Sequence, residues 1–89
     1  MRIKKGFTLR NIGADHVVVP EGIEVIDFNK LVSLNKSAKY LWEKVVGRDF
    51  TVEEMAKLLT EKYNVSPEDA LTDAGSLIER WREIGLLEE

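Results

Sequence analysis

Hydrophobic and polar residues alternate near the start of the chain, as is typical of β-strands. Residues 7–12 (FTLRNI) alternate apolar and polar side chains, and residues 16–20 (HVVVP) are rich in β-branched residues and end in a proline. A turn signal, residues 13–15 (GAD), separates the two segments and predicts a β-hairpin. Residues 31–34 (LVSL) predict a short third strand, whereas residues 23–28 fit neither the strand period nor the helix period.

From residue 35 onward the apolar positions follow a helical period. Asn35 is suited to cap a first helix, which we expect to end at Gly47. Thr51 and Glu54 have the spacing of a capping box, which predicts the start of a second helix. The apolar stripe of the first helix comprises Ala38, Leu41, Trp42, Val45 and Val46, and that of the second comprises Met55, Leu58 and Leu59, with Tyr63 as a further candidate.

A third helix begins at Ser66 and Pro67, which are suited to the cap and the first helical turn, and Gly85 is its natural end. Its apolar face spans about 140°, which is wider than one neighbouring helix covers. We therefore expect one margin of the face to remain free, either that of Leu71 and Ile78 or that of Leu77 and Ile84. The face comprises Ala70, Leu71, Ala74, Leu77, Ile78 and Trp81.

The order of elements is three strands followed by three helices, with no linker and no repeat. The second and third helices are joined by the short connection Asn64-Val65, which is the sequence form of a helix-turn-helix. We therefore predict one α+β domain over residues 1–89, resembling a winged helix, with a three-stranded antiparallel sheet followed by three helices.

Composition narrows the classes of function. The chain has 89 residues, of which 44% are hydrophobic and 33% charged, and it has no cysteine and one histidine, His16. Disulfides, thiolate metal sites and catalysis that needs two imidazoles are excluded, so we expect neither an enzyme nor a cofactor or metal site. The chain lacks a long apolar run and a signal-peptide pattern, so we expect no membrane partner and a cytoplasmic location.

The net charge of −3 is unevenly distributed. Residues 1–45 carry eight Lys/Arg and five Asp/Glu, a balance of +3, whereas residues 46–89 carry five and eleven, a balance of −6. The third helix would read DNA in a winged helix, but it holds five acids and only two basic residues, Arg80 and Arg82. Acids on this helix repel phosphates, so we expect no nucleic-acid partner.

Three further features remain as candidates for chemistry or binding. Asp15 and His16 are adjacent, but a turn aspartate beside a strand is the simpler interpretation. Trp42 and Trp81 favour core packing, and Trp81 is the better candidate for a partly exposed anchor because its helix has the wide face. The strand at residues 31–34, if it lies at the edge of the sheet, is a template for an added peptide strand.

The sequence resembles the PqqD-like family over about residues 3–88. The segments that carry the resemblance are residues 6–10 (GFTLR), 16–20 (HVVVP), 28–29 (FN), 34–35 (LN), 41–43 (LWE), 63–70 (YNVSPEDA) and 84–88 (IGLLE). The resemblance implies a non-catalytic module that recognises ribosomally made, post-translationally modified peptides. Such a module holds the leader of a precursor peptide and presents it to a modifying enzyme, as with the radical S-adenosylmethionine enzyme of pyrroloquinoline quinone biosynthesis.

In that family the leader adds as a strand to the third strand and lies against the third helix. Carried over to this chain, the resemblance places Leu31, Val32, Ser33 and Leu34 in strand pairing. The helical wheel then suggests Leu71, Ala74, Ile78 and Trp81 as pocket residues on the third helix. The open sheet edge is compatible with a monomer or a weak dimer.

Two other functions remain open at this point. One is a winged-helix transcriptional regulator, which would bind DNA with an affinity that falls steeply with salt. The other is a structural subunit that docks on a larger protein through the face of Trp81.

Overall fold

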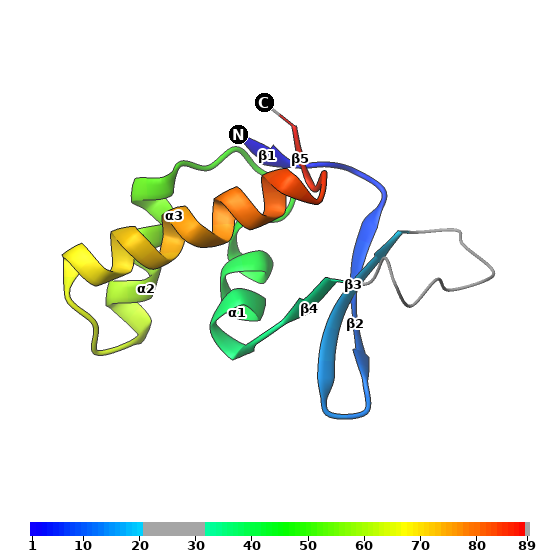
Figure 1. The fold of residues 1–89 in the computed structure, drawn as a ribbon, viewed down its shortest axis with the longest axis horizontal. Coiled ribbons are helices and arrows are strands. Elements are labelled where there is room, and N and C mark those ends of the chain that lie inside the picture. Colours follow the sequence, from blue (N-terminus) through cyan, green and yellow to red (C-terminus); the bar gives the residue numbers. More distant parts are fainter. Residues whose placement is uncertain (21–31, 89) are drawn as a thin grey trace.

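The computed structural model describes residues 1–20 and 32–88, and it confirms an α+β fold in which a three-stranded antiparallel sheet precedes three helices (Figure 1). The sheet has the order β2-β3-β4, and β1 and β5 form a second, two-stranded sheet. The expectations for residues 23–28, 28–29 and Leu31 lie outside the described residues. The elements are β1 (Arg2–Ile3), β2 (Phe7–Ile12), β3 (Asp15–Pro20), β4 (Val32–Leu34), α1 (Lys36–Val45), α2 (Val52–Lys62), α3 (Pro67–Glu83) and β5 (Leu87–Glu88).

The predicted hairpin is present, with a two-residue loop between the paired residues Ile12 and Asp15. Gly13 opens the loop with a φ of +62°, a conformation that glycine adopts without steric cost and that suits a type II′ turn. The turn fixes the register, so that Leu9 lies opposite Val18 and both pack against the helices.

All three predicted helix caps are confirmed. The side chain of Asn35 accepts a hydrogen bond from the Ala38 amide at 2.8 Å, and Thr51 and Ser66 each accept one at 3.1 Å from the amide three residues later. At the other end of α3, Gly85 has a φ of +81°, and the Leu86 amide donates to the Trp81 carbonyl at 2.9 Å. This is a Schellman ending, which needs glycine at that position.

The predicted stripe of α1 is wrong at its last member, Val46. The helix ends at Val45, and Val46 has an extended conformation (φ −60°, ψ 135°) that turns its side chain outward, so that it is 45% exposed. Gly47 follows with a φ of +83° and completes the exit of the chain, as predicted.

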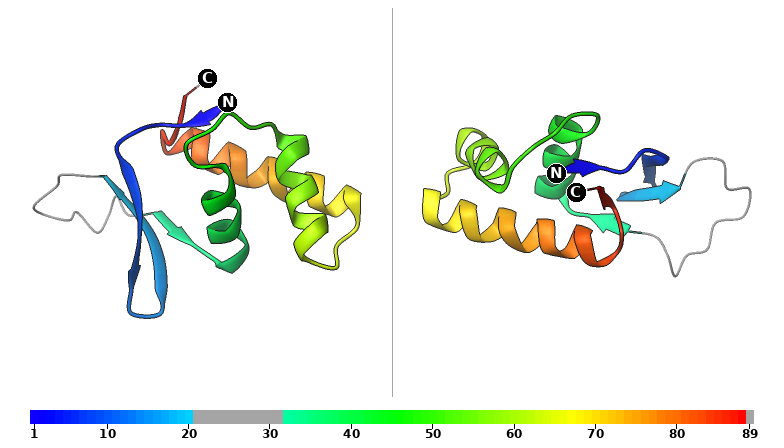
Figure 2. Two further views of the ribbon diagram at one scale, coloured as in Figure 1. Left: turned by 180° about the vertical axis from the view of Figure 1, so that it is seen from behind. Right: turned by 90° about the horizontal axis from the view of Figure 1, so that it is seen from above.

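The core lies where α3 covers α1 and α2. Figure 2 shows α3 as a layer of its own, with α1 and α2 together on one side of it and the hairpin beyond its C-terminal end. Trp42 and Trp81 meet edge to face at the centre, with ring centroids 5.5 Å apart. The favoured interpretation of Trp42 and Trp81 as core residues is confirmed. The alternative of a partly exposed anchor is wrong, because Trp81 is 0% exposed and packs between α3 and α1.

The sheet formed by β1 and β5 was missed by the sequence reasoning, because strands of two residues show no period. It joins the two ends of the described chain, with Ile3 paired to Leu87. The Phe50 amide donates to the Met1 carbonyl at 2.9 Å, and the Lys4 amide donates to the Leu86 carbonyl at 2.8 Å. The first residues therefore help to fix the C-terminal end of α3. No helix in the described part of the chain has the length and apolar character that crossing a lipid bilayer requires.

Candidate functional site

The edge of the three-stranded sheet is the first part of the candidate site. β4 pairs with β3 through three residue pairs, from Val18 opposite Val32 to His16 opposite Leu34. Within the described residues, the other side of β4 has no strand partner. Ser33 is exposed and Val32 is half-buried, while Leu34 is buried against the helices. An unpaired edge of this kind presents backbone N–H and C=O groups to an incoming strand.

Of the α3 residues chosen from the helical wheel, Leu71 and Ile78 line a hollow on the surface, whereas Ala74 and Trp81 do not. Ala74, Ile78 and Trp81 are 0%, 3% and 0% exposed, and all belong to the core. Leu71 is 46% exposed. Three of the four side chains therefore hold α3 on the domain, and Leu71 alone of the four presents an exposed surface.

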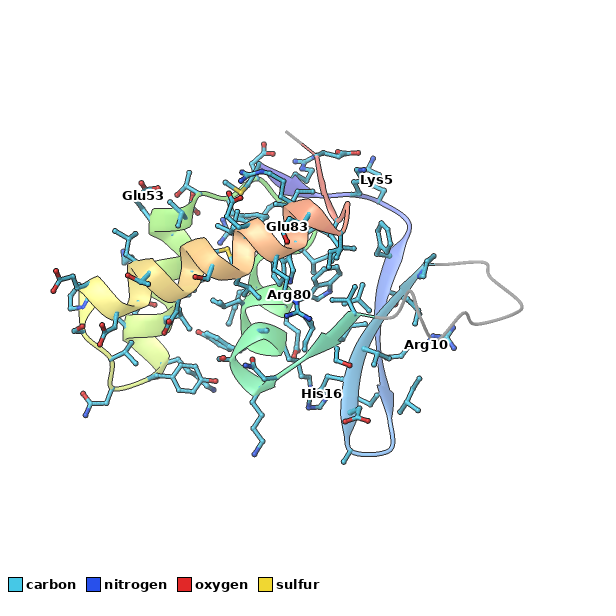
Figure 3. The ribbon with its side chains drawn as sticks, in the orientation of Figure 1. Lys5, Arg10, His16, Glu53, Arg80 and Glu83 are labelled. Carbon is cyan, nitrogen blue, oxygen red and sulfur yellow. The ribbon has the colours of Figure 1, made fainter. Side chains whose placement is uncertain are left out.

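The margin of α3 that faces β4 carries Arg80. In Figure 3 the Arg80 side chain extends from α3 in the direction of β4, while Glu83 lies on the side of α3 toward the viewer. Leu77 precedes Arg80 by three residues and Ile84 follows it by four, so both share this margin. Leu71 precedes Arg80 by nine residues, and about 100° per residue places it on the opposite margin. Leu77 and Ile84 therefore belong to a margin that the sequence left open as an alternative, whereas Arg80 was not among the expected site residues.

This margin of α3 and the start of α1 line a groove. Asn35, the residue after β4, lies at the end of the free strand edge. The hollow continues round α3 to Leu71, Met1 and Val52, and its lining also includes Glu79, Arg82 and Glu83. The lining includes Asn35, Ser37 and Leu41 from the cap and the body of α1, and Asp73, Leu77 and Arg80 from α3.

The groove offers apolar surface and a positive charge, which are groups suited to binding a peptide. Leu77 lines the groove and is half-buried, and Ile84, which lies outside the lining but on the same margin of α3, is 45% exposed, so both offer apolar contact area. Arg80 offers a cation, and no ion pair to it is present among the described residues. An extended peptide beside β4 could therefore use its backbone on the strand edge and its side chains on α3.

Two polar contacts that involve titratable side chains, those of His16 and Glu54, lie away from the groove. His16 contacts the side chain of Asn11, with Nδ1 and Oδ1 2.6 Å apart, and no contact joins it to Asp15 in the structure. The Arg48 guanidinium donates to the Glu54 carboxylate at 2.8 Å and lowers the pKa of that group. Among residues 1–20 and 32–88, no cluster of three or more His, Asp and Glu side chains could hold a metal ion.

A protein-family model matches most of the chain, including the residues of β4 and α3. The model of the family described as coenzyme PQQ synthesis protein D (PqqD) matches residues 15–87, which run from β3 to β5. The match therefore includes β4, α3 and the lining of the groove apart from Met1, whereas residues 6–10 precede it. No curated protein and no solved structure matches the chain significantly.

Proposed function

The chain belongs to the PqqD family, whose members are accessory, non-catalytic proteins of coenzyme PQQ synthesis, and on that premise we propose that it is a peptide-binding module. In the cytoplasm it binds an extended segment of a ribosomally made precursor peptide and presents it to a modifying enzyme. A radical S-adenosylmethionine enzyme is the expected partner. The observation that carries the proposal is the one-sided pairing of β4 next to a groove along α3.

Strand addition explains why a domain of this size can bind a peptide without a deep cavity. The backbone of the peptide completes the hydrogen bonds that the edge of β4 leaves open, and this part of the affinity does not depend on the peptide sequence. Residues Val32, Ser33 and Leu34 take part through their backbone, as expected from the family resemblance. Only alternate residues of a strand direct their backbone groups to the same edge, so this short strand supplies few hydrogen bonds.

Specificity then depends on the side chains of α3. Successive residues of an added strand point to opposite faces, so every second peptide side chain meets the margin of Leu77 and Ile84. Apolar peptide residues fit these two side chains. Arg80 lies between them and favours a carboxylate in the peptide at the neighbouring position.

The test compares two exposed apolar residues on opposite margins of α3. Ile84 and Leu71 are 45% and 46% exposed, so a lysine at either position has a similar, small effect on folding. Ile84→Lys removes apolar contact worth about 1–2 kcal/mol, so we expect the Kd of the precursor peptide to rise about 5- to 30-fold. Leu71→Lys should change the Kd less than about twofold.

The measurement is isothermal titration calorimetry with the precursor peptide encoded beside this protein, supported by amide NMR shifts at Val32–Leu34 and along α3. If Leu71→Lys weakens binding and Ile84→Lys does not, the peptide lies on the other margin and the assignment of the groove is wrong. If the wild-type protein binds no precursor peptide, the proposed function itself is wrong.

A further inference from the structure

A second hollow lies on the outer face of α1. By helical spacing, this face is opposite the buried stripe that α1 turns toward the core. Residues of β3 and of the C-terminal end of α2 complete it. We call this surface the lysine–tyrosine patch, and its residues are His16, Lys36, Lys39, Tyr40, Glu43, Lys44, Lys62 and Tyr63.

Two tyrosines form the floor of the patch. The rings of Tyr40 and Tyr63 meet edge to face, with centroids 6.2 Å apart, and both side chains are half-buried. The ammonium group of Lys62 lies 5.0 Å from the centroid of the Tyr40 ring, and that of Lys44 lies 5.7 Å from it. Each cation is attracted to the ring, but two cations at one ring also repel each other. An anion placed between Lys44 and Lys62 would relieve this repulsion.

The positive charge of the patch is not compensated by its own acids. The patch contains four lysines and one glutamate, a balance of +3 with His16 neutral. Glu43 pairs with Lys39, with the charged atoms 3.9 Å apart. In the part of the chain that the structure describes, no ion pair engages Lys36, Lys44 or Lys62. A local excess of positive charge is unusual on a chain whose net charge is −3.

The patch lacks arginine, the side chain best suited to hold a phosphate group through two parallel hydrogen bonds. All four cations are lysines, which pair with a carboxylate as compact point charges, and the patch contains no arginine fork for a phosphate group. The half-buried tyrosines add a surface for an apolar or aromatic side chain between the charges. A long polyanion would also meet the acidic residues 46–89, whose balance is −6.

We propose that the lysine–tyrosine patch is a second docking surface and that it binds a short acidic segment of a partner protein. Carboxylates of the segment pair with Lys36, Lys44 and Lys62, and its backbone crosses the tyrosine floor. The patch and the peptide groove share Lys36 and Tyr63 in their linings, so the two occupants would be neighbours. The proposal does not depend on peptide binding at β4, because none of the patch charges comes from α3.

The probe for the test is an acetylated, amidated hexaglutamate peptide, titrated at low ionic strength into the ¹⁵N-labelled full chain. We expect saturable amide shifts at residues 36–44 and 62–63, and none with hexaglutamine. The double variant Lys44→Glu/Lys62→Glu should raise the Kd of hexaglutamate by about tenfold or more, because two exposed charge pairs become repulsions.

The matched control, Lys5→Glu/Lys57→Glu, alters the net charge equally at exposed residues outside the patch, and Figure 3 shows Lys5 far from His16. Its Kd should change less than about twofold. Lys44→Gln/Lys62→Gln, which should also weaken binding, replaces the first variant if that one fails to fold.

Three outcomes would overturn the proposal: no shifts with hexaglutamate, equal weakening in both charge variants, or tighter binding of a six-nucleotide single-stranded DNA than of hexaglutamate. The last result would make the patch a nucleic-acid surface. Loss of precursor-peptide binding in Ile84→Lys leaves this test unaffected, so the two proposals fail independently.

Discussion

Replacing Ile78 with alanine tests whether this residue of α3 stabilises the fold or contacts the peptide. The side chain is 3% exposed and packs in the core with Trp81 and Ala74. Removing a buried isoleucine down to alanine costs about 2–5 kcal/mol, because contacts are lost and a cavity remains. We take about 3 kcal/mol for Ile78→Ala. A chain of 89 residues has a stability of roughly 4–13 kcal/mol, so this loss is large but leaves most of the protein folded.

Urea unfolding followed by tryptophan fluorescence measures the effect. With an m-value of about 1.5 kcal/mol per molar, a loss of 3 kcal/mol lowers the midpoint by about 2 M. Leu71→Ala, on the same helix but 46% exposed, should change stability by no more than about 0.5 kcal/mol. For both variants we expect the folded protein to bind the precursor peptide as tightly as the wild type.

The reasoning would be refuted by the opposite pattern. If Ile78→Ala lowers the urea midpoint by less than about 0.3 M, which is about 0.5 kcal/mol, and yet weakens peptide binding tenfold, Ile78 contacts the ligand and is not a core residue. Ile78→Val, which removes one methylene at a cost of about 1 kcal/mol, serves where the alanine variant is too unstable for titration.

Three further predictions concern pH, backbone conformation and DNA. The hydrogen bond from Arg48 lowers the pKa of Glu54 below its ordinary value of 4.5. The bond therefore stabilises the fold above pH 4.5, and this stabilisation is lost as the pH falls through the lowered pKa. In Glu54→Gln, thermal melts below pH 4.5 should lack this part of the acid sensitivity. Gly85→Ala forces alanine into a φ of +81° and should lower the stability by about 1–2 kcal/mol, or several degrees in Tm. Gly75→Ala should raise the Tm, because Gly75 lies inside α3 and no atom is within 4 Å of the added Cβ. In gel-shift assays at low salt, duplex DNA should not be retarded, and a retarded band that disappears with added salt would favour the regulator function.

The fold could be predicted where local chemistry determines it. Asn35, Thr51 and Ser66 act on amides three residues away, so the starts of all three helices could be predicted from short segments. The strands of the hairpin followed from alternation and from the turn at Gly13. The pairing of β1 with β5 is different, because it joins residues more than eighty positions apart and leaves no periodic signal.

The edge strand of the candidate site could be predicted from the sequence, but the margin of α3 that lies beside it could not. The helical wheel correctly placed Leu71 and Leu77 on different margins of α3, but a wheel carries no information on which margin faces the sheet. That choice depends on how α3 crosses α1 in three dimensions, where Trp42 and Trp81 fix the contact. The wheel also includes residues at the centre of the apolar face, such as Ala74, and these are the ones that packing against the domain buries.

The charge of α3 links the fold to the proposed function. A helix-turn-helix places its second helix against DNA, and phosphates then require basic residues on that helix. Here the outer side of α3 carries Glu68, Glu79 and Glu83, all exposed, and Glu79 pairs with Arg82, one of the two basic residues on this helix. Arg80 is the remaining basic residue of α3, and it extends toward β4 (Figure 3). An acidic outer side disfavours DNA, while a cation directed at a free strand edge favours a peptide that carries a carboxylate, so the charges of α3 support a groove for a peptide.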